Sequence, residues 1–327
     1  MKVLVTGGAG YVGGVSVEAI LEAGHEVVVL DDLSTGHAPI VHPAARLVQG
    51  SYGDEGATRS LLEGERVDAI LHCAARSLVA ESVADPAKYY RDNVAGGIAL
   101  LEAARAAGVR RVVFSSTAAV YGVPASTPIR EDAPLAPINT YGETKRTFEG
   151  ALRWYGAAYG FGSVILRYFN VAGATERLGE VHRPETHLIP NLLHAAEGGP
   201  ALTMFGEDYP TPDGTPIRDY LHVWDLADAH LAALGATADL DGEPLVCNLG
   251  TAVGFSVKEV LAAAASVVGA EIPHTVGPRR AGDPPVLVAS NERARETLGW
   301  TPTRSTLEEM IGSAWAWRRA HPGGYGD

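Results

Sequence analysis

The stretch KVLVTGGAGYVGG, residues 2–14, decides the fold of this chain. A short apolar run with the length of a buried strand leads directly into closely spaced glycines. Apolar residues then recur with helical spacing from Val15 to Ala23, and Gly24 closes the pattern. A strand, a glycine turn and a helix in immediate succession predict the opening of a parallel β-α-β unit.

The same alternation of strand and helix patterns continues to about residue 170. Helices are expected over 87–108 and after Asn139, and strand-like runs are HEVVVLDD (25–32), VDAILHCAA (67–75), RRVVFSS (110–116) and GSVILRYFN (162–170). Strands separated by helices pair in parallel through right-handed crossovers. We therefore predict an α/β protein with a doubly wound parallel sheet of the Rossmann type.

The amino-acid composition of the sequence changes after Asn170. Two long segments, GATERLGEVHRPETHLIPN (173–191) and GEDYPTPDGTPIRDY (206–220), are rich in proline, glycine and charge, which favours binding loops. We expect a first domain over 1–170 and a smaller α/β lobe over 171–327. The strand-like PLVCNLG (244–250) predicts that part of the second stretch returns to the first domain.

Composition narrows the possible partners and location. The 327 residues carry a formal net charge of −13 without a basic patch, which argues against nucleic acid and acidic membranes as partners. A chain that opens directly into a strand, without a signal-peptide pattern or an apolar run long enough for a membrane span, is expected in the cytoplasm. The two cysteines, Cys73 and Cys247, lack CxxC spacing, and His182, His187 and His194 lack HExxH or other close ligand spacing, so neither a disulfide nor a metal is expected.

The glycine turn predicts a dinucleotide site. Gly7, Gly10 and Gly13 have GxxGxxG spacing between a strand and a helix, where backbone amides can approach a pyrophosphate. Asp31 ends the next strand 18 residues after Gly13. A carboxylate at this point would hold a ribose diol and repel a 2′-phosphate. We therefore predict NAD as the cofactor.

A second constellation predicts acid-base chemistry on an alcohol. SSTAAVYG (115–122) begins at the end of the predicted strand RRVVFSS, and YGETK (141–145) follows at a predicted helix start. Tyr141 and Lys145 are four residues apart and share one helix face. Lysine is rare here, with four against 22 arginines, so an ammonium at 145 points to a specific need. Tyr141 is expected to be the base, with its pKa lowered by Lys145 and an oxidised nicotinamide, and Thr117 to relay the substrate proton.

Together these motifs resemble the extended short-chain dehydrogenase/reductase family, in particular its nucleotide-sugar 4-epimerases. The resemblance runs the whole length, through VLVTGGAGYVG, DDLSTG, FSSTAAVYG, YGETK, LRYFNVAGA, PIRDYLHVWDLADAH and RRAGDPP. It implies a tightly held NAD that takes hydride from C4 of a UDP-hexose and returns it to the other face, interconverting UDP-galactose and UDP-glucose. It also implies a homodimer formed through the helices over 87–107 and 141–159.

The resemblance assigns site residues as well. The catalytic residues would be Thr117, Tyr141 and Lys145. Contacts with NAD would be made by Gly7, Gly10, Tyr11, Val12, Gly13, Asp31, Asp32, Asn93, Lys145 and Tyr168, with Phe169 also against the nicotinamide. Besides Thr117 and Tyr141, the UDP-sugar would be held by Asn170, His187, Leu188, Phe205, Arg218, Arg280 and Asp283.

Four positions depart from the family pattern. Ser51 stands where an acid is common, Ser77 where a lysine is common, and His187 where an asparagine is common. Leu287 has intermediate size at the position expected to gate the sugar pocket, so activity on UDP-N-acetylhexosamines is an alternative. A dehydratase is disfavoured because Ala118 and Ala119 replace its acid-base pair. An inactive NAD sensor is disfavoured because it has no need of the three catalytic side chains.

Overall fold

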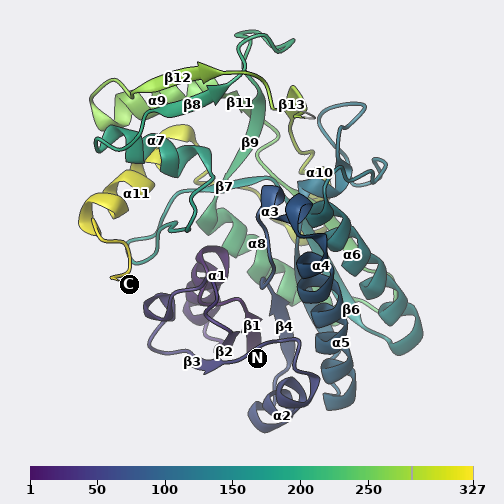
Figure 1. Ribbon diagram of the computed structural model, residues 1–327. Coiled ribbons are helices and arrows are strands. Elements are labelled where there is room, and N and C mark those ends of the chain that lie inside the picture. Colours follow the sequence, from purple (N-terminus) through teal and green to yellow (C-terminus); the bar gives the residue numbers. More distant parts are fainter. Residues whose placement is uncertain (281–282, 327) are drawn as a thin grey trace.

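A seven-stranded, all-parallel sheet forms the larger part of the molecule (Figure 1). The structure is a computed structural model that describes residues 1–280 and 283–326. In spatial order the strands are β10 (Leu245–Leu249), β6 (Gly162–Tyr168), β5 (Arg111–Thr117), β4 (Ala69–His72), β1 (Lys2–Thr6), β2 (Glu26–Asp31) and β3 (Arg46–Gln49). The predicted doubly wound sheet is confirmed.

Helices cover both faces of this sheet. One face carries α1 (Tyr11–Glu22), α8 (Val223–Ala236) and α10 (Glu292–Leu298), and the other carries α2 (Glu55–Glu65), α5 (Gly96–Ala107) and α6 (Thr140–Tyr159). Side chains of a strand alternate between faces, so Val3 and Val5 pack toward α1 and α8 whereas Leu4 packs with the α5 and α6 core. Burial on both faces explains why these strands read as continuous apolar runs.

The order of the strands places a binding crevice after β1. The chain runs outward from β1 through β2 to β3, and then continues on the other side of β1 with β4, β5 and β6. In such sheets ligands bind outside the carboxyl ends of the strands, at the point where the order reverses. The glycine turn after β1 and the catalytic candidates after β5 therefore open toward the same side of the sheet.

The helix expected over 87–108 is interrupted. Helix α4 (Pro86–Tyr89) passes through a π-helical segment, η2 (Tyr90–Ala95), into α5. Short α3 (Val79–Ala84) precedes them. A π turn inserts an extra residue and shifts the inward face, and here Tyr89, Asn93 and Leu100 are all buried. Periodicity alone did not reveal this turn.

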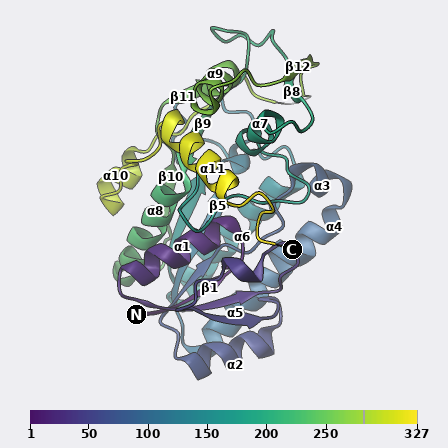
Figure 2. The same ribbon diagram turned by 90° about the vertical axis from the view of Figure 1, so that its left-hand side faces the viewer.

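A smaller lobe lies beyond the carboxyl edge of the sheet (Figures 1 and 2). Its strands are β7 (Asn170–Ala172), β9 (Ile217–His222), β11 (Gly254–Ser256) and β13 (Val286–Leu287), with a separate pair, β8 (Leu202–Phe205) and β12 (His274–Gly277). Helices α7 (Leu188–Ala196), α9 (Val257–Val268) and α11 (Leu307–Ala320) enclose an apolar core around Leu192, Val260 and Met310. Between these elements the chain returns to the large sheet, where α8, β10 and α10 pack.

Within residues 1–280 and 283–326, every helix is too short or too polar to cross a bilayer.

Candidate active site

The carboxyl ends of the parallel strands open into a cleft of about 1400 Å³. Its walls come from the glycine turn after β1, from the ends of β2, β4, β5 and β6, and from loops of the smaller lobe. This volume exceeds the roughly 300–1000 Å³ of an ordinary small-molecule pocket. The cleft is therefore large enough for a dinucleotide together with a second ligand.

Thr117, Tyr141 and Lys145 converge in this cleft. Thr117 ends β5, and Tyr141 lies in the first turn of α6, whose N-cap Asn139 accepts a hydrogen bond from the N–H of Gly142. Nζ of Lys145 lies 5.9 Å from the centroid of the Tyr141 ring and donates a 2.8 Å hydrogen bond to the carbonyl oxygen of Ser115. A hydroxyl, a phenol and an ammonium thus face one space.

Burial controls the protonation of this group. It lowers the pKa of Lys145 to about 8, even though Cys73 and Glu149 act in the opposite direction. It raises the pKa of Tyr141 to about 12, although a side-chain hydrogen bond with Thr117 lowers it. For the protein's own groups, desolvation of the phenol outweighs its polar contacts, and the lowering of the Tyr141 pKa by Lys145 together with an oxidised nicotinamide stays a prediction.

The turn after β1 can accept a pyrophosphate. Gly7 has φ of +75°, and a Cβ on Gly13 would lie 2.2 Å from the carbonyl oxygen of Gly7, so the turn requires glycine at both positions. Asp31 lines the cleft, and its two carboxylate oxygens accept hydrogen bonds from the N–H groups of Ala9 and Leu33. The carboxylate is thereby fixed at the end of β2, and the turn and the acid together fit a dinucleotide.

Most of the other residues predicted to contact NAD also line the cleft. They are Gly10, Tyr11, Val12, Asp32, Tyr168 and Phe169. The hydroxyl of Tyr11 donates to the carbonyl oxygen of Gly173 at 2.5 Å, which ties the start of α1 to the loop after β7. Asn93 lies instead behind the wall, where its amide bonds both the N–H and the C=O of Arg76. Asn93 therefore positions the Arg76 segment of the cleft wall.

The residues predicted to hold the UDP-sugar lie mainly at the end of the cleft that the smaller lobe forms. Asn170, His187, Arg218, Arg280 and Asp283 line the cleft. The guanidinium of Arg280 lies 4.2 Å from the centroid of the Phe205 ring, and Arg218 donates to Asp283 at 2.5 Å. Phe205 ends β8 and Leu188 begins α7, and neither is part of the described cleft lining. Ser51, Ser77 and Leu287, the departures from the family pattern, do line it.

The loop between β7 and α7 brings two histidines together with two acids. Nδ1 of His182 and Nδ1 of His187 lie 3.2 Å and 2.9 Å from Oε1 of Glu180. Glu185 completes the group, whereas His194 is exposed on α7. Spacing in the sequence did not reveal this group, because the loop must fold back on itself to bring His182 and His187 to Glu180.

Sequence reasoning missed a cation in the cofactor half of the cleft. Arg76 lines it and donates to Asp92 and to the hydroxyl of Ser34, both at 3.0 Å, with Asp32 3.9 Å away. It immediately precedes Ser77 and supplies a positive charge where a lysine had been expected one residue later. A basic residue directly after an alanine pair that ends a strand was the available signal.

A buried network beneath the site was missed as well. Arg167 on β6 forms a two-fold ion pair with Glu149 on α6 at 3.0 Å and 2.6 Å. Ser116 donates to Glu149 at 2.5 Å, and Arg167 also donates to the hydroxyl of Tyr121 at 2.8 Å. The pair is 5% and 7% exposed and joins α6 to β6, and the hydroxyl of Ser116 links the same carboxylate to the strand that ends in Thr117. No local sequence pattern links residues 149 and 167.

A doubly wound sheet with a glycine cradle, an acid after β2 and a buried Tyr-Lys pair defines a dinucleotide-dependent enzyme fold of the short-chain dehydrogenase/reductase class. The model of the NAD dependent epimerase/dehydratase family matches residues 3–250, and the chain belongs to that family.

Individual relatives are similar over the whole length. The chain is 49% identical to the UDP-glucose 4-epimerase of Lacticaseibacillus casei, with 100% of this chain and 99% of the relative covered. It superposes with a TM-score of 0.93 on the crystal structure of UDP-glucose 4-epimerase from Brucella ovis in complex with NAD, at 44% identity, covering 96% of this chain and 97% of that one. The UDP-Glc/GlcNAc 4-epimerase of Campylobacter jejuni gives a TM-score of 0.86 at 40% identity, covering 98% and 99%.

Proposed function

We propose that the protein is a UDP-glucose 4-epimerase, an isomerase that interconverts UDP-galactose and UDP-glucose by transient oxidation at C4 with a tightly bound NAD. One observation carries this assignment. The Thr117, Tyr141 and Lys145 group lies in a single cleft between a glycine cradle and the arginines of the smaller lobe. Full-length relatives with this function and NAD-bound neighbours support it.

The chain's own residues divide the work of holding NAD. The turn at Gly7, Gly10 and Gly13 receives the pyrophosphate, with Tyr11 and Val12 at the start of α1 beside it. Asp31 and Asp32 face the adenosine ribose, and Arg76 neutralises part of their charge. Tyr168 and Lys145 lie at the nicotinamide end. When bound, NAD supplies the hydride acceptor and, in its oxidised form, a positive charge near Tyr141.

Tyr141 takes the proton from the C4 hydroxyl of the sugar while the C4 hydride leaves. Because burial raises the pKa of Tyr141 to about 12, proton transfer depends on cationic charge close to the phenol. Lys145 is held near it by the Ser115 carbonyl, and Thr117 aligns the hydroxyl that loses its proton. Return of the hydride to the other face of C4 and of the proton to the C4 oxygen would give the epimer, so the net oxidation state is unchanged.

The smaller lobe holds the uridine diphosphate. Arg218 and Arg280 suit a diphosphate because guanidinium groups bind phosphate oxygens through two hydrogen bonds at once. Asp283 orients Arg218, and Phe205 supports Arg280 from its ring face. We assign Asn170, His187 and Leu188 to the same ligand, with Leu188 acting through the position of the His187 turn.

Activity on UDP-N-acetylhexosamines is the second candidate. Leu287 on β13 lines the cleft and is paired in register with Arg218 on β9, so its side chain stands beside the proposed diphosphate clamp. Leucine leaves more room there than tyrosine and less than alanine. The related Campylobacter jejuni protein is described as acting on both sugar types.

The remaining assignments concern the domain bounds, the cellular location and the oligomeric state of the protein. We place the NAD-binding domain at 1–170 and the sugar-binding lobe at 171–327, with α8, β10 and α10 returning to the large sheet. We place the protein in the cytoplasm as a homodimer that pairs through the α4 to α6 side. Trp154 on α6 is 67% exposed and Tyr90 is 44% exposed, which leaves aromatic surface for a partner. Sedimentation equilibrium giving the mass of one chain would refute the dimer.

The direct test of function is proton NMR of purified protein with UDP-galactose and no added NAD. Appearance of UDP-glucose is expected. A second run with UDP-N-acetylglucosamine tests the alternative. Absence of any conversion, after NAD is supplied and sugar-nucleotide binding is verified, would overturn the assignment and favour an NAD-binding protein without epimerase activity.

A further inference from the structure

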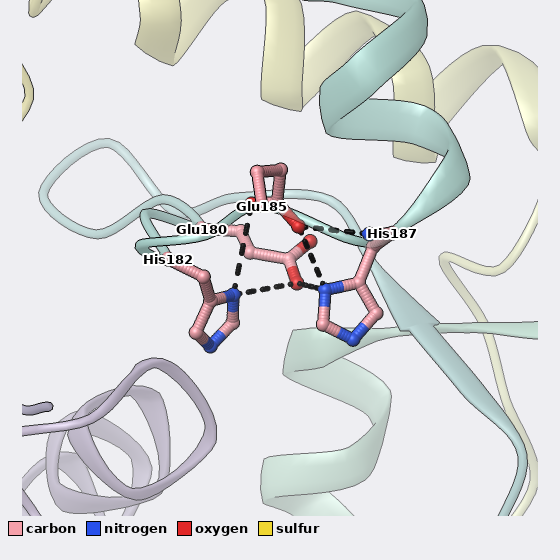
Figure 3. A group of neighbouring side chains, drawn as sticks. All are labelled: Glu180, His182, Glu185 and His187. Atoms are coloured by element: carbon pink, nitrogen blue, oxygen red, sulfur yellow. Dashed lines mark hydrogen bonds and ion pairs between the residues drawn. The ribbon is translucent and has the colours of Figure 1, made fainter. Parts of the chain in front are cut away.

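The loop between β7 and α7 carries a group of titratable side chains that the proposed acid-base chemistry does not use, although one member, His187, is also assigned to the nucleotide. Glu180, His182, Glu185 and His187 each present one ligand atom, and these four atoms lie within 4.8 Å of one another. Figure 3 shows the Glu180 carboxylate between the two imidazole rings. All four come from a segment of eight residues, so the group can form within one loop.

The spacing of these atoms matches a tetrahedral metal site. Zinc bound at about 2.1 Å by nitrogen and oxygen has ligand-to-ligand edges of about 3.4 Å. The imidazole-to-carboxylate distances are 3.2 Å and 3.7 Å for Nδ1 of His182, to Glu180 and Glu185. For Nδ1 of His187 both distances are 2.9 Å, and the Glu185 oxygen is Oε1 in this contact but Oε2 in the contact with His182. Small movements would bring all four atoms to a common centre.

One atom of the group lies close to two carboxylates without a hydrogen bond. Nδ1 of His182 is buried and makes no well-formed hydrogen bond with any residue that the structure describes, although it lies 3.2 Å from Glu180. A buried ring nitrogen that faces two carboxylates without a well-formed hydrogen bond is open to another occupant. A metal ion satisfies it without a directional hydrogen bond.

Backbone hydrogen bonds hold the carboxylate of Glu185 in a position from which it can bind a metal ion. Its Oε1 accepts hydrogen bonds from the backbone N–H groups of Thr186 and His187, at 2.8 Å and 2.9 Å. These contacts fix the carboxylate and leave Oε2 directed toward His182. Outer contacts that orient a ligand in this way are typical of metal centres.

From this geometry we propose that Glu180, His182, Glu185 and His187 bind a divalent transition-metal ion such as Zn²⁺ at the edge of the sugar-nucleotide cleft. Two imidazoles and two carboxylates form a donor set suited to such ions. The ion also offsets the charge of Glu180, whose side chain is only 7% exposed beside a cleft assigned to anionic nucleotides.

Protons compete with the ion for the same atoms. Burial opposes charge on His182 and His187, yet the carboxylates of Glu180 and Glu185 raise the pKa values of these imidazoles to about 9 and about 10. In the absence of metal the group therefore holds two imidazolium ions paired with two carboxylates. Metal binding releases these protons.

The test uses untagged full-length protein, Zn²⁺ as the probe, and His182→Gln and Glu185→Gln as variants. His194→Gln is the matched control, because His194 is an exposed histidine on α7 outside the group. After dialysis against Zn²⁺ at pH 8 and then metal-free buffer, elemental analysis should give about one ion per chain for wild type and His194→Gln. Each loop variant should bind at least tenfold more weakly.

Two results would overturn the site. One is wild-type protein without retained Zn²⁺, which would make the loop an ion-paired clamp of protonated histidines. The other is equal retention in His182→Gln and Glu185→Gln. If a variant fails to fold, Co²⁺ added to wild type decides, since a tetrahedral site gives intense visible absorption and an octahedral surface site does not.

Discussion

Nζ of Lys145 donates a 2.8 Å hydrogen bond to the carbonyl oxygen of Ser115, which ties the first turns of α6 to the end of β5. The contact fixes the ammonium at the base of the cleft, 5.9 Å from the centroid of the Tyr141 ring. It also leaves two ammonium protons for other partners, such as ribose hydroxyls. This hydrogen bond therefore fixes the position of the helix that carries Tyr141 relative to the strand that ends in Thr117.

Removing the phenol oxygen should abolish turnover. Tyr141→Phe is expected to lower the epimerisation rate by about 100-fold or more, the usual contribution of a positioned acid-base group. Binding of UDP-galactose by calorimetry should remain close to wild type, because Arg218 and Arg280 are untouched. Tyr159→Phe, at the half-exposed end of the same helix, is the control and should keep full activity. Near wild-type turnover of Tyr141→Phe would refute the assigned base.

Burial of Lys145 should make stability depend on alkaline pH. Its pKa is lowered from 10.5 to about 8, mainly by desolvation, so the unfolded chain binds the proton more tightly. Below pH 8 both states are charged and the folded state carries the full penalty, about 3 kcal/mol. Between pH 8 and 10.5 wild type should gain stability relative to Lys145→Met, measured by urea unfolding. A stability difference independent of pH would contradict the buried ammonium.

The buried pair of Arg167 and Glu149 should be costly to break from one side. Glu149→Gln leaves a guanidinium without its counter-charge at a site 5% exposed, and should reduce the free energy of unfolding by about 3–5 kcal/mol. The double variant Glu149→Gln/Arg167→Met removes the stranded charge and should recover part of the loss. Chemical denaturation of the three proteins measures both steps. A double variant no more stable than Glu149→Gln would contradict this interpretation.

The strand and helix sequence of the large domain was predictable, but the pairing of Arg167 with Glu149 was not. Apolar runs and glycine turns are local signals, and they located β1, β2, β4, β5, β6 and the start of α6. Arg167 and Glu149 meet only because β6 and α6 pack together, which is a tertiary event without a periodic signature.

The candidate site was also predictable only in part. Thr117, Tyr141 and Lys145 converge because two motifs stand at the ends of predictable elements. His182 and His187 stand in an irregular loop, where the sequence does not specify the backbone path, and only the folded loop brings them to Glu180. The π-helical turn that buries Asn93 was hidden for a related reason, since one inserted residue leaves the apolar pattern on both sides intact.

Asp31 should decide the choice of dinucleotide. Asp31→Asn keeps one oxygen, which can accept one of the two backbone N–H bonds from Ala9 and Leu33, and removes the charge that repels a 2′-phosphate. We expect lower retention of NAD through gel filtration, and an increase of about tenfold in the affinity for NADP relative to NAD. Glu26→Gln, at the exposed start of the same strand, is the control. An unchanged NAD to NADP ratio would remove Asp31 from the cofactor site.

Leu287 should set the size of the accepted sugar. Leu287→Tyr adds bulk in the cleft and should lower kcat/KM for UDP-N-acetylgalactosamine by about 10-fold or more, with a smaller effect on UDP-galactose. Leu287→Ala should shift the ratio in the opposite direction. The ratio of the two kcat/KM values, measured on one preparation, corrects for folding losses. Equal effects of both changes on both sugars would place the gate elsewhere.

The central claim is that hydride leaves C4 of the sugar and returns from a cofactor that stays bound. The measurement is NMR of the product formed from UDP-galactose carrying deuterium at C4, in ordinary water and without added NAD. The account predicts UDP-glucose with the deuterium retained at C4, because the hydrogen travels as hydride and never exchanges with solvent. UDP-glucose with protium at C4 would contradict it, since that result requires removal of the hydrogen as a proton.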